Sequence, residues 1–163
     1  MDCENCGAAM RPDLERGVFV CDYCGGEFVP PPDAGGVLVL GESTEECPIC
    51  ARHLSNGSLE TYSLKYCTGC HGMLIAMDLL VNLVEAVRPR RGGFSGRVEP
   101  YRLVDADRHL RCPSCGSRMD GHPYCGGGNV NVDSCEKCGL VWLDGGELRR
   151  IAAAPDRDPL YRE

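Results

Sequence analysis

Large aromatic side chains are scarce in this sequence. Of its 163 residues only 6% are aromatic, with one Trp and three Phe, whereas 21 are Gly and 11 are Pro. A chain so poor in bulky side chains is not expected to build one large core, and units below about 40 residues rarely fold without metal or disulfides. We therefore expect several small units held together by something other than apolar packing.

Membrane-spanning and targeting segments are also missing. No apolar run approaches the roughly 20 residues that cross a bilayer. The chain starts Met1-Asp2-Cys3, which leads directly into a cysteine pair without the basic start and apolar stretch of a signal peptide. These features predict a cytoplasmic protein without membrane contact, in which thiols bind metal rather than form disulfides.

Recognisable catalytic motifs are absent as well. The histidines form neither H-E-x-x-H nor another paired pattern, and no glycine loop is followed by the lysine of a phosphate-binding site. We therefore expect a protein that is not an enzyme. The histidines are His53, His71, His109 and His122.

Cysteine, in contrast, is abundant, with 13 copies of which 12 form six C-x-x-C pairs. Each such pair makes a tight turn with both sulfurs facing one point, and two turns supply the tetrahedron of thiolates that Zn²⁺ prefers at a structural site. Consecutive pairs combine into three groups, which predicts three Zn²⁺ per chain, each without an open position for substrate. The predicted ligands are Cys3, Cys6, Cys21 and Cys24; Cys47, Cys50, Cys67 and Cys70; and Cys112, Cys115, Cys135 and Cys138.

Crossed pairing between groups is the alternative. Loop-closure entropy rises slowly with loop length and so argues only mildly against it. The stronger argument is a repeat of apolar residues at fixed offsets from the cysteines, which predicts a separate miniature core on one face of each copy. These residues are Met10, Val18 and Phe28; Leu54, Leu64 and Leu74; and Met119, Val132 and Trp142.

The repeats predict a small metal-stabilised α+β protein of three tandem zinc ribbons. Each ribbon would consist of two rubredoxin-like knuckles and a short antiparallel sheet, with short helices after ribbons 2 and 3. The predicted boundaries are ribbon 1 at 1–29, a Pro/Gly linker with a short strand at 30–44, ribbon 2 with an amphipathic helix at 45–88, an Arg/Gly-rich linker at 89–109, ribbon 3 with its helix at 110–154, and a tail at 155–163.

Two helices are expected from capping residues and apolar spacing. Asp78 is the predicted cap of a helix over 78–87, whose apolar residues recur as i, i+1, i+4, i+5 and i+8. This apolar face would pack on another ribbon, or dock a partner or a second copy of the chain. Asp144 and Glu147 form the start of the second helix, which continues through Ile151.

The third cysteine group carries a family resemblance. From Cys112 to Leu148 the chain has C-P-S-C, nineteen residues, and C-E-K-C-G-L-V-W-L-D-G-G-E-L. This pattern resembles the zinc-ribbon family named after transcription factor IIB, closely over 112–151 and as a degenerate copy over 47–87, while ribbon 1 is a generic zinc ribbon. The resemblance implies the fold and a bound zinc, and it makes a transcription-related partner plausible.

The net charge favours a protein partner over nucleic acid. The formal net charge is −7, and three tetrathiolate zinc sites of −2 each bring it to about −13, which disfavours nonspecific nucleic-acid binding. Our leading interpretation is a non-enzymatic adaptor that binds other proteins. The alternative is a nucleic-acid-binding regulator that uses residues 88–111, where seven arginines face three acids.

Two side chains leave further alternatives open. Cys125 has no partner in the pattern; it is interpreted as a free thiol, but with His122 it could be a spare ligand pair or a redox-active group. His71 follows Cys70 directly and could replace a thiolate of the second site. A third function, redox or chaperone activity of the cysteine pairs, is not distinguished by the sequence.

Overall fold

The computed structural model describes residues 1–88, 108–124 and 129–154. It contains a three-stranded sheet, β1-β2-β3, and a seven-stranded sheet in the order β4-β5-β6-β7-β10-β9-β8. All pairings are antiparallel. The architecture is therefore the predicted α+β class with three cysteine groups, but the ribbons are not all separate.

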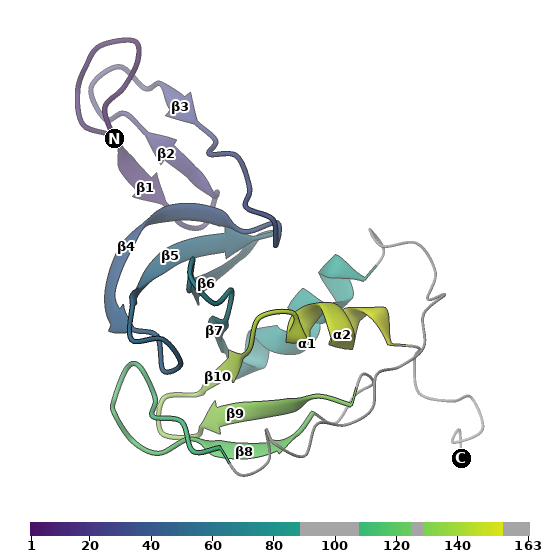
Figure 1. Ribbon diagram of the computed structural model, residues 1–163. Helices are drawn as coiled ribbons and strands as arrows, with labels where there is room; N and C mark the ends of the chain where they lie inside the picture. The colour runs from purple at the N-terminus through teal and green to yellow at the C-terminus, as the bar shows by residue number, and fades with distance from the viewer. Residues whose placement is uncertain (89–107, 125–128, 155–163) are drawn as a thin grey trace.

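Ribbon 1 is the small sheet alone, with β1 (Arg11–Asp13), β2 (Val18–Val20) and β3 (Glu27–Phe28). Figure 1 shows it projecting from the rest of the molecule, next to β4. The Ser63 hydroxyl in β6 donates to the Leu14 carbonyl at 3.2 Å. Ribbon 1 thus touches the main body through its hairpin end and keeps its cysteines at the far end.

Ribbons 2 and 3 share the large sheet. Ribbon 2 supplies β5 (His53–Leu59), β6 (Tyr62–Tyr66) and β7 (Met73–Ala76), and ribbon 3 supplies β8 (Asp120–Pro123), β9 (Asn131–Cys135) and β10 (Leu140–Leu143). The last strands of the two ribbons pair with each other, with Leu74 opposite Trp142. The two copies therefore meet edge to edge and remove one exposed edge from each.

The strand predicted in the linker is longer than expected. It forms β4 (Leu38–Glu46), which runs past the predicted boundary at residue 44 and pairs with β5. Two register shifts interrupt this pairing, between Val39 and Gly41 and between Glu42 and Glu46. The second half of the linker is therefore part of the ribbon 2 sheet.

The apolar positions of each copy do not form one miniature core, and that prediction was wrong. Leu54, Leu74, Met119 and Trp142 pack with cysteines of both ribbons in one cluster. The middle position of each copy, Leu64 or Val132, belongs to a second cluster together with the helices. Because side chains alternate along a strand, a shared sheet has two faces and each copy contributes to both. In ribbon 1, Phe28 is exposed.

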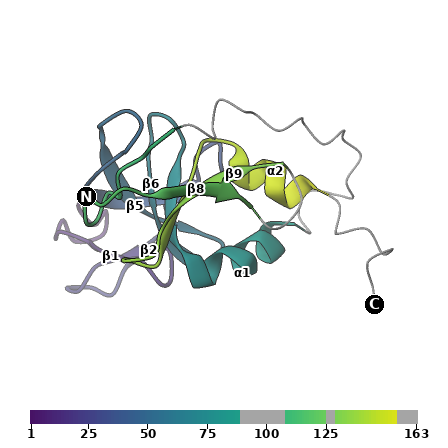
Figure 2. The same cartoon turned by 90° about the horizontal axis from the view of Figure 1, so that it is seen from below.

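The helices α1 (Met77–Val87) and α2 (Glu147–Ala153) lie side by side in both ribbon views (Figures 1 and 2). They share a cluster that includes Leu83 and Val84 of α1 and Ile151 of α2. The apolar face of α1 therefore packs within the chain, on the helix of the other ribbon. This is the first of the alternatives predicted for it, packing on another ribbon. On the outer side Val81 stays exposed.

The predicted capping residues do not cap these helices. Helix α1 follows Ala76 without a side-chain cap, and Asp78 lies inside its first turn. Helix α2 follows Gly146, two residues after Asp144. Only half of the expected capping box forms: the Glu147 carboxylate accepts from the Asp144 N–H at 2.7 Å, while the Asp144 side chain is engaged elsewhere. In the residues described here, no helix is long and apolar enough to cross a membrane.

Candidate metal centres

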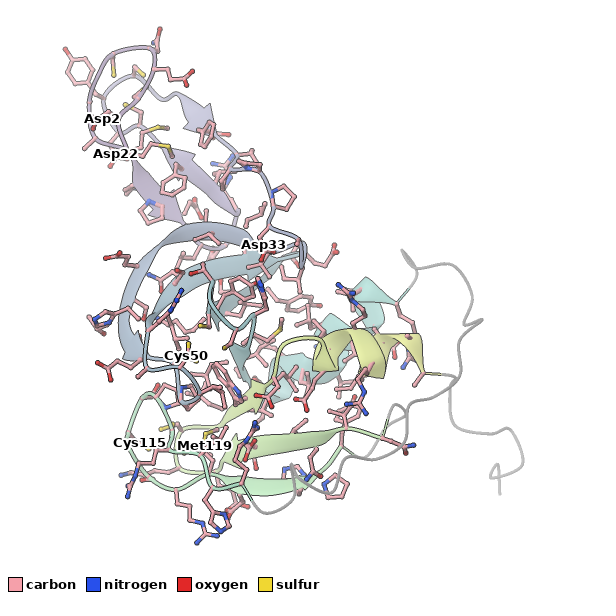
Figure 3. All side chains as sticks on the ribbon, in the orientation of Figure 1. Asp2, Asp22, Asp33, Cys50, Cys115 and Met119 are labelled. Atoms are coloured by element: carbon pink, nitrogen blue, oxygen red, sulfur yellow. The ribbon has the colours of Figure 1, made fainter. Side chains whose placement is uncertain are left out.

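The structure gathers the predicted cysteines into three groups of four, with sequential rather than crossed pairing. Within each group all sulfurs lie within 4.8 Å of one another. Contacts across a group measure 3.6 Å for Cys3–Cys24, 3.5 Å for Cys47–Cys70 and 3.7 Å for Cys115–Cys135. Figure 3 shows the sulfurs clustered at the end of ribbon 1 and near the labelled Cys50 and Cys115.

These distances fit Zn²⁺. Four sulfurs about 2.3 Å from a central ion lie about 3.8 Å apart in a tetrahedron, close to the contacts just given. The distances are too long for the S–S bond of about 2.05 Å in a disulfide, and the twelve cysteines are all free thiols. Each group can therefore hold one zinc ion with four thiolates and no open coordination position.

The knuckles repeat one backbone pattern. The N–H of the first cysteine donates to the carbonyl five residues on, as from Cys3 to Ala8 at 2.8 Å, and in the last pair Cys135 lies opposite Leu140, also five residues on, in the β9–β10 pairing. The residue after every second cysteine has a positive φ, which aims the chain back past the sulfurs. This position is filled by Gly7, Gly25, Ala51, His71, Gly116 and Gly139. Ala51 and His71 adopt it despite their Cβ atoms.

Hydrogen-bond donors ease ionisation of individual thiols. The Asn5 side chain and the Gly26 backbone lower the pKa of Cys24 to about 6. The side chain and backbone of Ser117 lower the pKa of Cys115 to about 6. Since the thiolate is the zinc ligand, these donors favour the binding form of one cysteine in each of the two sites, while hydrogen bonds among the cysteines raise the pKa of Cys6 and of Cys138 to about 12.

The three sites differ in burial. In ribbon 1 the second cysteine of each pair, Cys6 and Cys24, is exposed, whereas in ribbon 3 Cys115 and Cys138 are half-buried. Cysteines of ribbons 2 and 3 also pack in one cluster with Trp142. No residue of ribbon 1 belongs to either cluster. Sites 2 and 3 are thus embedded in a common core, while site 1 stands alone.

Arg108 links the segment before ribbon 3 to the strands behind its zinc site. Its guanidinium donates to Asp144 at 2.6 Å and to Asp133 at 2.9 Å, and the Trp142 indole N–H donates to the other Asp144 oxygen at 2.8 Å. Burial lowers the pKa of Arg108, but hydrogen bonds to Asp144 and Asp133 outweigh it and raise the pKa. Burial raises the pKa of Asp133 despite this partner. The sequence pattern had grouped Arg108 with the other arginines of residues 88–111. Nothing in the sequence near Arg108 indicates that the buried Asp133 is its partner.

His71 lies beside the second site without joining it. Its Nδ1 is 2.7 Å from the Tyr66 hydroxyl and 3.7 Å from the Asp33 carboxylate, and the Tyr66 hydroxyl donates to Asp33. The group of candidate ligands around Cys70 contains only cysteines. The alternative in which His71 replaces a thiolate is therefore wrong, because four sulfurs already converge there.

Several predicted features fall outside the described residues: Cys125, most of the Arg-rich segment and the tail. Of the other arginines in that segment, Arg88 lies 3.3 Å from Glu85, and Arg111 donates to the Gly116 carbonyl at 3.2 Å. His122, the suggested partner of Cys125, has its Nε2 3.0 Å from the Ser134 hydroxyl.

Comparison with known proteins identifies one segment. Residues 111–154 match the family described as transcription factor zinc-finger. This segment is ribbon 3 with α2, and it confirms the resemblance inferred from its motif. Neither a curated protein nor a solved structure matches the chain.

Proposed function

We propose that this zinc-binding protein is a non-enzymatic adaptor that presents rigid zinc-ribbon surfaces to other proteins. The observation that carries the proposal is the combination of closed four-thiolate sites with a sheet shared by ribbons 2 and 3. A zinc ion with four thiolates has no position for water or substrate and serves structure. The shared sheet then makes a rigid body from which ribbon 1 projects (Figure 1).

The proposed partner is a protein, and the family of ribbon 3 makes a transcription-related one the first to test. A second copy is a weaker candidate, because the buried residues of α1 already pack within the chain. These residues are Leu80, Leu83, Val84 and Val87. We expect the protein to act in the cytoplasm.

The test compares two binding experiments on the zinc-loaded full chain. Cross-linked capture from native extract should recover a defined protein. That protein, once purified, should bind the purified zinc-loaded chain directly. In a filter-binding titration with duplex DNA and with RNA, we expect no affinity at physiological salt. Affinity that falls steeply with salt and is lost on neutralising Arg88, Arg90 and Arg91 would replace the adaptor by the nucleic-acid-binding regulator.

A further inference from the structure

A cavity of about 260 Å³ lies where three distant segments of the chain meet. Ala34 belongs to the turn before β4, His71 and Met73 to the end of ribbon 2, and Leu148 and Arg149 to α2 of ribbon 3. The cavity exists only because ribbons 2 and 3 share a sheet. The three zinc sites are complete without this cavity.

One wall is fixed by a chain of hydrogen bonds. The Asp33 carboxylate accepts the N–H of Gly35 at 2.8 Å and that of Val37 at 3.0 Å, which holds the turn. It also accepts the Tyr66 O–H. Although burial raises the pKa of Asp33, hydrogen bonds from Tyr66, Val37 and Gly35 outweigh this effect and lower it, so the carboxylate is ionised.

This chain sets the hydrogen-bonding role of His71. Since the Tyr66 hydroxyl gives its proton to Asp33, its oxygen accepts from His71 Nδ1–H at 2.7 Å. The other ring nitrogen, Nε2, takes no part in this chain, and the side chain is 57% exposed at the cavity.

Arg149 of α2 also lines the cavity and supplies a positive charge. Its side chain is exposed, and it makes no hydrogen bond or ion pair within the described part of the chain. Two other lining side chains are apolar and buried, Met73 at 6% and Leu148 at 5% exposure. The cavity is therefore lined by a guanidinium, an imidazole held in place by Tyr66, and apolar side chains.

The neighbouring zinc site limits the charge of a ligand. Cys70 lines the cavity, and with zinc bound its site carries −2. Repulsion grows in proportion to ligand charge, so a dianionic phosphate is disfavoured relative to a single carboxylate. Guanidinium and carboxylate match in geometry as well.

We propose that this cavity binds the free C-terminus of a protein partner. The terminal carboxylate would pair with Arg149, the last peptide group would hydrogen-bond to His71 Nε2, and a small apolar side chain would lie on Met73 and Leu148. This inference rests on the proposed adaptor function and names the part of the partner that is recognised.

The experiment uses the zinc-loaded full chain and fluorescent peptides that end in Ala, Val, Leu or Phe. Each peptide is prepared with a free carboxylate and as the C-terminal amide, and binding is followed by anisotropy to millimolar concentration. At least one free-acid peptide should bind about tenfold or more tightly than its amide, as expected for loss of a charge-assisted bond. Arg149→Gln should abolish this preference, and His71→Asn should weaken binding of both forms. Arg16→Gln, an equal charge change in ribbon 1, should change neither.

Equal binding of acids and amides, no binding of any peptide, or a preference that survives Arg149→Gln would each overturn the proposal. Zinc content measured on every variant separates these outcomes from loss of the fold. If a purified protein partner still binds Arg149→Gln as tightly as the original chain, the adaptor function holds and the C-terminal site alone is wrong.

Discussion

At the scale of single residues, the knuckles show how a short motif controls the backbone. The chain must turn with positive φ after every second cysteine, and four of the six positions are glycine. Glycine adopts this conformation without steric cost, whereas a Cβ costs about 1–2 kcal/mol. The glycines could be predicted from the motif. The exceptions at Ala51 and His71 could not, because their strain is offset by zinc and by packing elsewhere.

Replacement of Ala51 by glycine should stabilise the zinc-loaded protein by about 0.5–1 kcal/mol, since relief of backbone strain exceeds the added entropy of the unfolded chain. Ala51 has a φ of 55°. Urea denaturation at fixed free zinc measures the effect. The reverse change at Gly116, where φ is 69° and an added Cβ would meet nothing within 4 Å, should destabilise by about 1 kcal/mol. If both changes shift stability in the same direction, backbone strain is not the cause.

Arg108→Met should destabilise the fold by about 2–3 kcal/mol, because it leaves the Asp133 carboxylate, 5% exposed, without its ionic partner. The further change Asp133→Asn should recover part of the loss, which a double-mutant cycle in urea would measure. The exposed pair Arg16–Glu27 is the control, and Arg16→Met should change little. Equal effects of the two arginine changes would show that burial of Asp133 does not matter.

At the scale of elements, the junction of β7 and β10 depends on glycine for close approach rather than for conformation. A Cβ on Gly72 would lie 2.2 Å from Cζ2 of Trp142, and one on Gly145 would lie 2.3 Å from the Cys70 carbonyl oxygen. Both contacts join ribbon 2 to ribbon 3. Both strands are short continuous apolar runs, MLIA and LVWL, and the sequence predicted a short sheet in each ribbon without indicating that these two strands pair, because an apolar run carries no information about which edges meet.

Gly72→Ala should destabilise the zinc-loaded chain by about 1–3 kcal/mol, since the added methyl forces apart the buried indole and the knuckle. Near-ultraviolet circular dichroism should show a changed environment of Trp142, the single tryptophan. Gly121→Ala is the matched control, because its methyl would meet nothing closer than 3.5 Å. An unchanged tryptophan signal together with unchanged stability would contradict this close packing.

At the scale of the whole molecule, ribbons 2 and 3 share one sheet, whereas ribbon 1 forms a sheet of its own. Ribbons 2 and 3 contribute cysteines and apolar side chains to a common cluster, and their helices pack in another. Within residues 1–29 the buried hydrophobic side chains are Cys3, Val18 and Cys21. Ribbon 1 therefore depends on its zinc ion for order, whereas the other two stabilise each other.

Zinc should leave the protein in two stages on titration with a chelator. Site 1 should empty first, and sites 2 and 3 should then empty together, because folding of each supports the other. Native mass spectrometry should show species with three, two and no zinc ions and little with one. Cys6→Ser should remove one zinc equivalent, and Cys50→Ser should also weaken site 3. Independent loss of three ions would contradict the shared core.

The sequence by itself determined the local chemistry: the three groups of thiols, their sequential pairing, a short antiparallel sheet in each ribbon and both helices. These follow from spacing and periodicity within stretches of at most about forty residues. Tertiary structure alone decided that β7 joins β10, that α1 packs on α2, that Arg108 is an internal ion-pair partner, and that a cavity forms between ribbons. Those features depend on which surfaces exclude water together, and such contacts between distant segments leave no pattern along the chain.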